Sequence, residues 1–484
     1  MTASRAWCSA AAATLLFGLL HGCGTSLDSL GNNAGTSGSL SAGASGDPSG
    51  GSSSGSSGGG SAGSTAGVSG GSITGAGANA GAGGDANAGA SGEATAGAGG
   101  DATLELQPLI CPASYPNTFK TVLGKADTEI TKKLSDAFQQ LFHGKASSEA
   151  IYIEQGTDQA YVRDFLHTDI RTEGIALAML ISVELDKHDE FDRLWRYAKA
   201  HQDTAAPKAG FFDSTCTDNA DMNTPCIDVY GMEQFLTALL FASDRWGSTL
   251  AMPYATDARA LLDQLRRKES INGGVVGGIT DVFDAKTKLV REQPIENIVD
   301  HTRASLEMPA YYELWGQASG DSFWQAAADA ARIHLAAAAD KTAGLWPMRS
   351  YFNGEPVAGD TFGTEGYRAL INVAVDALWG KAPSSETQVA DRILATFRSL
   401  GLDSYSYSGT FTPGGAPKDT KTTRVQSLIA SSGALAVAAS NPQNRTDFPN
   451  AVWAQLIPTG DSRYYDGILY LTSLLILSGQ YRCY

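Results

Sequence analysis

Two kinds of helical pattern alternate along the chain from residue 126 onward. In the first kind, apolar residues cover almost every side of the helix, which indicates burial inside the protein. In the second kind, apolar residues recur at helical spacing on one face only. The first kind is predicted at 171–186, 232–246, 304–318 and 367–379, the second at 126–142, 191–202, 255–267, 322–338 and 385–400, and two further helices at 423–439 and 465–477.

This alternation predicts an all-α fold of two concentric rings, with buried helices inside and amphipathic helices outside. No β-α-β rhythm is present, and β-rich stretches are confined to short loops such as 270–291. The folded part spans 104–484, which is large for one core, so either two domains or one large barrel is expected. Because no second Gly/Ser linker follows residue 104, we predict a single α/α barrel.

The first 23 residues have the pattern of an export signal. Arg5 precedes an apolar run at 10–20, which is too short to span a bilayer. The run leads into Leu20-His-Gly-Cys23, which resembles the lipobox of bacterial lipoproteins, where the cysteine carries the lipid. We therefore expect a lipid-anchored protein of the cell envelope, at the outer membrane or cell surface. The alternative is an ordinary signal peptide followed by secretion.

Residues 24–103 consist mainly of Gly, Ser, Ala and Thr, with no aromatic residue. Such a segment cannot bury enough apolar surface to offset the conformational entropy lost on folding. We predict a disordered tether between the anchored Cys23 and the folded domain at 104–484.

Charge and cysteine usage narrow the function further. The chain carries 51 acidic and 35 basic residues and has no basic stripe, which argues against a nucleic-acid partner. Of the six cysteines, Cys216 and Cys226 flank a polar loop and are expected to form a local disulfide. Cys111 and Cys483 would then join the two ends of the domain. No cysteine or histidine spacing suggests a metal site, and we expect neither metal nor cofactor.

A compact polar cluster stands directly before the buried helix at 171–186. It contains Asp169, Arg171 and Glu173. Charged groups at the mouth of a buried helix need partners or a function. One interpretation is a structural ion pair between Arg171 and a carboxylate, and the other is a functional site.

Several ordered blocks resemble glycoside hydrolase family 8, and most closely its exo-acting oligoxylanases, which release xylose from the reducing end. They lie at 134–144, 169–174, 191–195, 238–247, 308–313, 458–470 and 478–482. The resemblance implies an (α/α)6 barrel that hydrolyses β-1,4-linked oligo- or polysaccharides of the xylan or glucan class with inversion. We expect a monomer that meets a membrane only through its lipid anchor.

Inversion requires one carboxyl group as acid and another as base on a water, about 6.5–9.5 Å apart. The family's acid is the Glu of an Arg-Ser/Thr-Glu-Gly motif, which corresponds to Glu173. The family position that we align with its base holds Arg303, and an arginine is no base at neutral pH. An Asp that holds the sugar falls on Tyr230, and another sugar-binding Asp falls on Glu365.

Three explanations of these departures stay open. The base can have moved to Asp300 or to Asp228, the barrel can bind carbohydrate without cutting it, or the alignment can be displaced by a few residues. We select Glu173 and Asp300 as the catalytic pair. The predicted substrate-binding residues are Asp169, Arg171, Tyr230, Arg303, Glu365, Tyr367, Arg368 and Tyr465. Aromatic residues that can line a sugar cleft are Tyr230, Trp346, Tyr351, Tyr367, Tyr464 and Tyr465.

Overall fold

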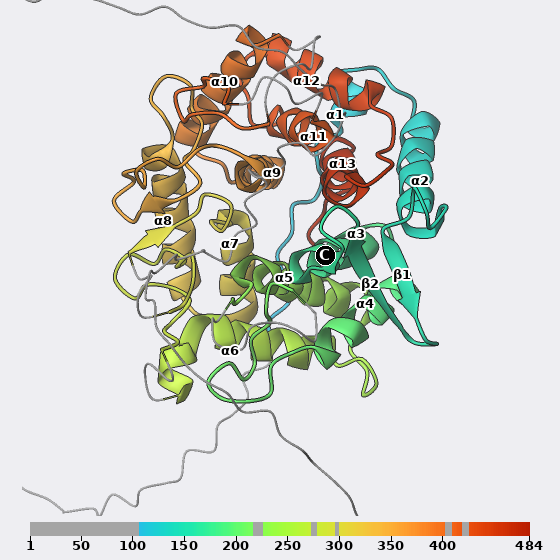
Figure 1. Cartoon of the computed structure of the whole chain (residues 1–484), viewed down its shortest axis with the longest axis vertical. Helices are drawn as coiled ribbons and strands as arrows, with labels where there is room; N and C mark the ends of the chain where they lie inside the picture. The colour runs from blue at the N-terminus through green and yellow to red at the C-terminus, as the bar shows by residue number, and fades with distance from the viewer. Residues whose placement is uncertain (1–105, 216–225, 273–277, 296–299, 402–408, 419–424) are drawn as a thin grey trace, which may run out of the picture. The chain divides into compact units, whose positions relative to one another are not determined.

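The computed structural model describes residues 106–484 apart from 216–225, 273–277, 296–299, 402–408 and 419–424 (Figure 1). Its helices are α1 (Thr118–Thr121), α2 (Asp127–His143), α3 (Thr172–Glu184), α4 (His188–Ala200), α5 (Val229–Trp246), α6 (Tyr254–Asn272), α7 (Pro309–Ser319), α8 (Phe323–Ala338), α9 (Thr364–Leu378), α10 (Ser384–Ser399), α11 (Gln426–Leu435), α12 (Pro442–Ala454) and α13 (Arg463–Leu477). Its strands are β1 (Tyr152–Gln155), β2 (Gln159–Asp164), β3 (Asp169–Ile170), β4 (His301–Thr302) and β5 (Ser350–Tyr351). The prediction of a mostly helical fold is confirmed.

The odd-numbered helices from α3 to α13 pack against one another. α3 packs on α5 and on α13, α11 packs on α13 and α9, and α9 packs on α7. The even-numbered helices α4, α6, α8 and α12 each pack on the helix that precedes them in the chain, and α10 packs on α8 and α12. In Figure 1 the labels α3, α5, α7, α9, α11 and α13 accordingly lie nearer the centre than α4, α6, α8, α10 and α12. None of the helices that the structure describes is long and apolar enough to cross a membrane.

Helix α3 shows why its sequence is apolar on nearly every side. All of its residues except Glu173 are buried, including Glu184 at its C-terminal end. Its first turn allows a close approach, because a Cβ atom on Gly174 would lie 2.6 Å from Cε2 of Tyr464 on α13. A larger residue at position 174 would therefore push α13 away from α3.

Three features differ from the sequence prediction. The predicted helix at 304–318 begins only at Pro309, and residues 304–308 form a turn and loop. Helix α12 was missed, because it is polar and carries Pro449 in its interior, which disfavours a helix. A three-stranded antiparallel sheet, in the order β1-β2-β3, was missed as well.

The two short sheets position segments that matter below. β3 pairs with the end of β2 in the register Asp164↔Asp169 and leads directly into α3. β4 pairs with β5 in the register His301↔Tyr351 and leads into the loop before α7.

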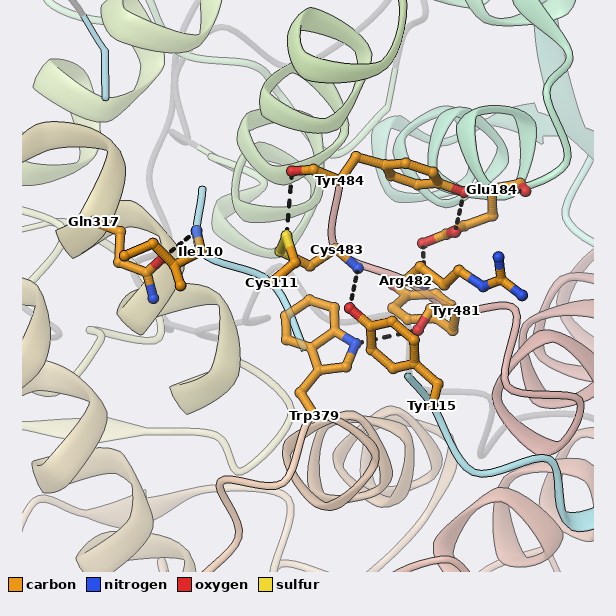
Figure 2. The surroundings of a disulfide bond; sticks show 10 residues. All are labelled: Ile110, Cys111, Tyr115, Glu184, Gln317, Trp379, Tyr481, Arg482, Cys483 and Tyr484. Carbon is orange, nitrogen blue, oxygen red and sulfur yellow. Dashed lines mark hydrogen bonds between the residues drawn. A yellow bond between two sulfur atoms is a disulfide. The ribbon is translucent and has the colours of Figure 1, made fainter. Parts of the chain in front are cut away.

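A disulfide joins the beginning of the described chain to its end (Figure 2). Cys111 and Cys483 have Cα atoms 5.4 Å apart, and the backbone N–H of Cys483 donates to the Tyr115 hydroxyl at 3.0 Å. The same C-terminal segment is tied to α3, because Glu184 accepts from the backbone of Arg482 at 2.9 Å. Cys216 lies outside the described residues, so its bridge to Cys226 stays a prediction, as do the signal peptide, Cys23 and the tether.

Candidate active site

A cavity of about 360 Å³ lies where the N-terminal ends of α3, α5 and α9 meet. Glu173 is in the first turn of α3, Asp228 is the N-cap of α5, and Glu365 is in the first turn of α9. All three carboxyl groups line the cavity. Helix N-termini carry partial positive charge and favour carboxylates nearby, so this convergence explains why the acidic residues gather here.

Both carboxylate oxygens of Glu173 have donors. The Tyr464 hydroxyl donates to Oε1 at 3.2 Å, and Nη1 of Arg368 donates to Oε2. The Glu173 side chain is 16% exposed. The first turn of α3 is held in place by Thr172, whose hydroxyl donates to the Asp213 carbonyl at 2.5 Å. Glu173 is therefore fixed in direction but still reached from the cavity.

Arg368 connects the carboxylates of two helices. Its Nη1 contacts Glu173 on α3, and its Nη2 contacts Glu365, one turn earlier on α9. The guanidinium carbon lies 4.2 Å from the ring centroid of Tyr230 on α5, within the range of a cation–π contact. One buried guanidinium thus separates Glu173 from Glu365.

Glu365 is held on one oxygen only. Its Oε2 accepts from Arg368, from Nη1 of Arg303 at 3.3 Å and from the Ser305 hydroxyl at 3.3 Å. Among the described residues no donor reaches Oε1. Burial would raise the pKa of Glu365, but the positive charges of Arg368 and Arg303 outweigh it and lower the pKa to about 2. Glu365 is therefore ionised at any working pH.

Asp228 differs from Glu365 in its charge state. The backbone N–H of Gly231 donates to its Oδ1 at 2.8 Å, which caps α5. Burial, and then the negative charge of Glu173, raise the pKa of Asp228 to about 7, against the lowering effect of that hydrogen bond. Asp228 is thus a mixture of acid and carboxylate near neutral pH.

Arg303 lies between two glutamates. Its Nε donates to Oε1 of Glu292 at 2.8 Å, and its Nη1 faces Glu365. Behind Glu292, Nε2 of His301 lies 2.6 Å from its other oxygen. Burial would raise the pKa of Glu292, but His301 and Arg303 outweigh it and lower the pKa to about 2. Arg303 is therefore fully paired rather than an isolated charge in the cavity.

Asp169 and Arg171 form the ion pair that the sequence suggested. Arg171 donates from Nε and Nη2 to the two oxygens of Asp169 at 3.1 and 3.0 Å, and its Nε lies 3.4 Å from Asp164. Both Asp169 and Arg171 line the cavity. Asp169 and Arg171 therefore form a structural ion pair and are also part of the cavity wall.

Three of the residues selected from the sequence lie outside the cavity lining. The Tyr367 hydroxyl donates to the Gly409 carbonyl, and the Tyr465 hydroxyl donates to the Thr364 carbonyl at 2.6 Å. The Asp300 side chain is 70% exposed and contacts His301 at 3.1 Å. Asp300 therefore faces solvent instead of Glu173, whereas the next residue, His301 at the start of β4, points inward to Glu292.

Glu292 and Gln293 are among the cavity residues that were not selected from the sequence. Glu292 supports Arg303, and Gln293 donates to the Ile227 carbonyl at 3.1 Å while no donor among the described residues reaches its buried Oε1. Neither residue belongs to a recognisable motif. The signal that was available for Glu292 is indirect, because a buried Arg303 requires a carboxylate partner.

Known proteins match this chain over most of its described length. Residues 161–479 match the family model of "Glycosyl hydrolases family 8". The reducing-end xylose-releasing exo-oligoxylanase Rex8A of Paenibacillus barcinonensis is 31% identical over 77% of this chain and 97% of its own length. An oligoxylanase of the same description from Halalkalibacterium halodurans is 31% identical over 76% of this chain and 94% of its own.

Solved structures agree as well. A family 8 protein from Teredinibacter turnerae, crystallised as a xylobiose complex, is 33% identical, with a TM-score of 0.69 over 76% of this chain and 97% of that one. The family match at 161–479 therefore includes every residue that lines the cavity. The chain belongs to glycosyl hydrolase family 8 and is a glycosidase.

Proposed function

We propose that this protein hydrolyses β-1,4-linked oligosaccharides with inversion and that xylo-oligosaccharides are its main substrates. The observation that carries the proposal is the pair Glu173 and Glu365, which face one cavity from opposite sides of Arg368. The names of the relatives favour xylose-based substrates. At about 360 Å³ the cavity is near the small end of the range for ligand sites, which favours short oligosaccharides over polymers.

Glu173 acts as the acid on the leaving oxygen, and Glu365 acts as the base on a water. Glu365 suits the base role because Arg368 and Arg303 keep it ionised and because its Oε1 is free of protein donors among the described residues. Asp228 instead has its Oδ1 engaged by the backbone N–H of Gly231, where it caps α5. We therefore assign the base to Glu365 in preference to Asp300 or Asp228.

Substrate binding requires one local rearrangement. Oε2 of Glu173 is occupied by Arg368 in the free protein. The glycosidic oxygen must take the place of this contact, while Nη2 of Arg368 stays on Glu365. The aromatic face of Tyr230, which now packs against the Arg368 guanidinium, supports that side of the cavity throughout.

The test is product release from xylo-, cello- and chitosan oligomers by the wild type and by Glu173→Gln. We expect release from xylo-oligomers and a loss of about 10²–10⁴-fold in the variant, the range for a general acid. Glu190→Gln is the matched control, because Glu190 is 17% exposed against 16% for Glu173 and is paired with His143. Binding of these oligomers without any release would instead support a carbohydrate-binding protein on the same fold.

We also propose that the helices close into an (α/α)6 barrel of six hairpins. Support comes from the contacts of α3 with α13 and from the alternation of inner and outer helices along the chain. Full burial of α5, α11 and α13 over most of their length supports their place in the inner ring.

For the N-terminal part we propose a lipid anchor at Cys23 and an 80-residue tether over 24–103. Cys23→Ser should abolish incorporation of labelled palmitate and release the protein from the membrane fraction. Cys8→Ser, inside the proposed signal peptide, is the matched control and should change neither. Unchanged labelling of Cys23→Ser would rule out the anchor without affecting the catalytic proposal.

A further inference from the structure

We propose that Arg303 is a positioning residue that holds the Glu365 carboxylate in the orientation for catalysis, with Glu292 and His301 as its fixed support. This inference rests on the proposed base role of Glu365. It assigns a function to the arginine at a position where the family resemblance predicts an aspartate. Arg303 acts through Glu365 and does not itself react.

The support behind Arg303 is rigid. Arg303 is 7% exposed and Glu292 is 4% exposed. Glu292 receives Nε of Arg303 on Oε1 at 2.8 Å and Nε2 of His301 on Oε2 at 2.6 Å, so both of its oxygens are engaged. His301 in turn is fixed in β4, which pairs with β5. Because the Arg303 guanidinium is planar and is bound to Glu292 through Nε, the position of its Nη1 near Glu365 is fixed as well.

The loop that carries Arg303 is also fixed to α9, the helix that carries Glu365. The Asn372 side chain on α9 donates to the carbonyl of Ser305 at 2.8 Å and to that of Glu307 at 3.2 Å. Thr302 donates to Oε1 of Glu307 at 2.9 Å. Arg303 and Glu365 are therefore joined by a direct contact and by a common backbone support, which is the arrangement that a positioning residue needs.

Arg303 determines which oxygen of Glu365 is available. Its Nη1 and the Ser305 hydroxyl approach the same oxygen, Oε2, as does Arg368. Because all three donors meet on Oε2, the carboxylate is turned with Oε1 toward the remaining space. Without Arg303, only Ser305 and Arg368 hold the Glu365 carboxylate, so it can rotate more freely. A small displacement of a catalytic group lowers the rate strongly.

The experiment compares the wild type with Arg303→Met, with the double variant Arg303→Met/Glu292→Gln, and with Arg398→Met. The double variant removes the arginine without leaving an ionised glutamate buried in its place. Arg398→Met is the matched control, because it removes a partly exposed guanidinium, paired with Asp447 at 2.7 Å, that does not line the cavity. Each variant is crystallised and its kcat, KM and pH profile are measured.

We expect a rotated Glu365 carboxylate in the crystals of both Arg303 variants and a kcat about 10–100-fold lower. KM should change by less than about threefold, since Arg303 makes no contact that binds the substrate equally in the ground state and the transition state. The acidic limb of the kcat profile should move to higher pH, because one of the two cations that lower the pKa of Glu365 is gone. The other groups that face Glu365 are Arg368 on α9, Asp228 and Tyr230 at the start of α5, and Tyr465 on α13, and all stay unchanged.

Two outcomes would overturn the inference. Full recovery of kcat in the double variant would mean that the single variant failed only because of an unpaired Glu292. An unchanged Glu365 orientation together with an unshifted acidic limb would show that Arg303 is only structural. If the wild type itself is inactive, the proposed function fails, but the crystals still decide whether Arg303 orients Glu365. If neither methionine variant folds, Arg303→Lys keeps the charge but removes the planar guanidinium, so the orientation of Glu365 and kcat, rather than the acidic limb, decide the question.

Discussion

Asp228 combines two roles at one position, the cap of α5 and a carboxyl group in the cavity. As a cap, its Oδ1 accepts from the backbone N–H of Gly231 at 2.8 Å. As a buried acid next to Glu173, it has a pKa raised to about 7. The folded state therefore retains a proton on Asp228 at pH values where the unfolded chain has lost it. This makes the folding stability dependent on pH.

Asp228→Asn should separate these roles, because asparagine is an equally good cap but does not titrate. In the wild type, stability from this residue falls as pH rises between about 4 and 7, since only the unfolded state ionises freely there. The variant should lack that fall and be more stable near pH 7 by on the order of 1–3 kcal/mol. Urea unfolding at pH 5 and pH 7.5 measures the difference. Equal pH slopes in both proteins would contradict the raised pKa.

At the scale of single residues, the sequence was informative where a motif exists. Glu173 follows from its Arg-Thr-Glu-Gly motif, and the structure places it in the cavity with Arg368 and Glu365. The choice of Asp300 had no such support, because only the three-dimensional course of β4 shows that its side chain faces solvent. Glu292 was missed because its contact with Arg303 is made by a loop without a motif.

At the scale of elements, α10 packs on α8 and carries a buried acidic residue in its first turn. Glu386 in the first turn of α10 is 1% exposed. Burial, and then the negative charge of Asp376, raise the pKa of Glu386 to about 9, although the positive charge of Arg332 opposes this. Arg332 itself is paired with Asp376 at 2.7 Å. Glu386 is therefore neutral in the folded protein at physiological pH.

Glu386→Gln should stabilise the protein, because a neutral side chain of the same shape needs no proton. Between about pH 4.5 and pH 9 the folded state holds a proton on Glu386 that the unfolded state has released, so wild-type stability from this residue falls as pH rises. We expect a gain of roughly 1–3 kcal/mol at pH 8 and almost none at pH 4. Thermal unfolding at both values measures it, and destabilisation at pH 8 would be inconsistent with a neutral Glu386.

The prediction of elements succeeded where apolar periodicity was strong and failed where it was weak. The inner helices were found within a few residues of their ends, since burial on all sides leaves a clear pattern. α12 was missed because Pro449 stands in its interior and its exposed face is polar. The start of α7 was placed five residues too early, because Ala304, Leu306 and Met308 are apolar and buried for a different reason. They pack around the cavity loop without being helical.

At the scale of the whole molecule, the disulfide between Cys111 and Cys483 closes a chain segment of 372 residues. A crosslink over so long a loop restricts the unfolded chain strongly. Cys111→Ser/Cys483→Ser should therefore lower the stability of the folded unit by about 2–4 kcal/mol without changing kcat. Differential scanning calorimetry of both proteins under oxidising conditions provides the measurement. An unchanged melting temperature would show that the bond adds nothing to stability.

The anomeric form of the first product tests the central claim most directly. Proton NMR of xylo-oligosaccharide hydrolysis in D2O follows both anomers before they equilibrate. If Glu173 and Glu365 are an inverting pair, the α-anomer of the newly formed reducing end appears first, and Glu173→Gln and Glu365→Gln each abolish it. Early β-anomer, or wild-type rates in either variant, would contradict the account.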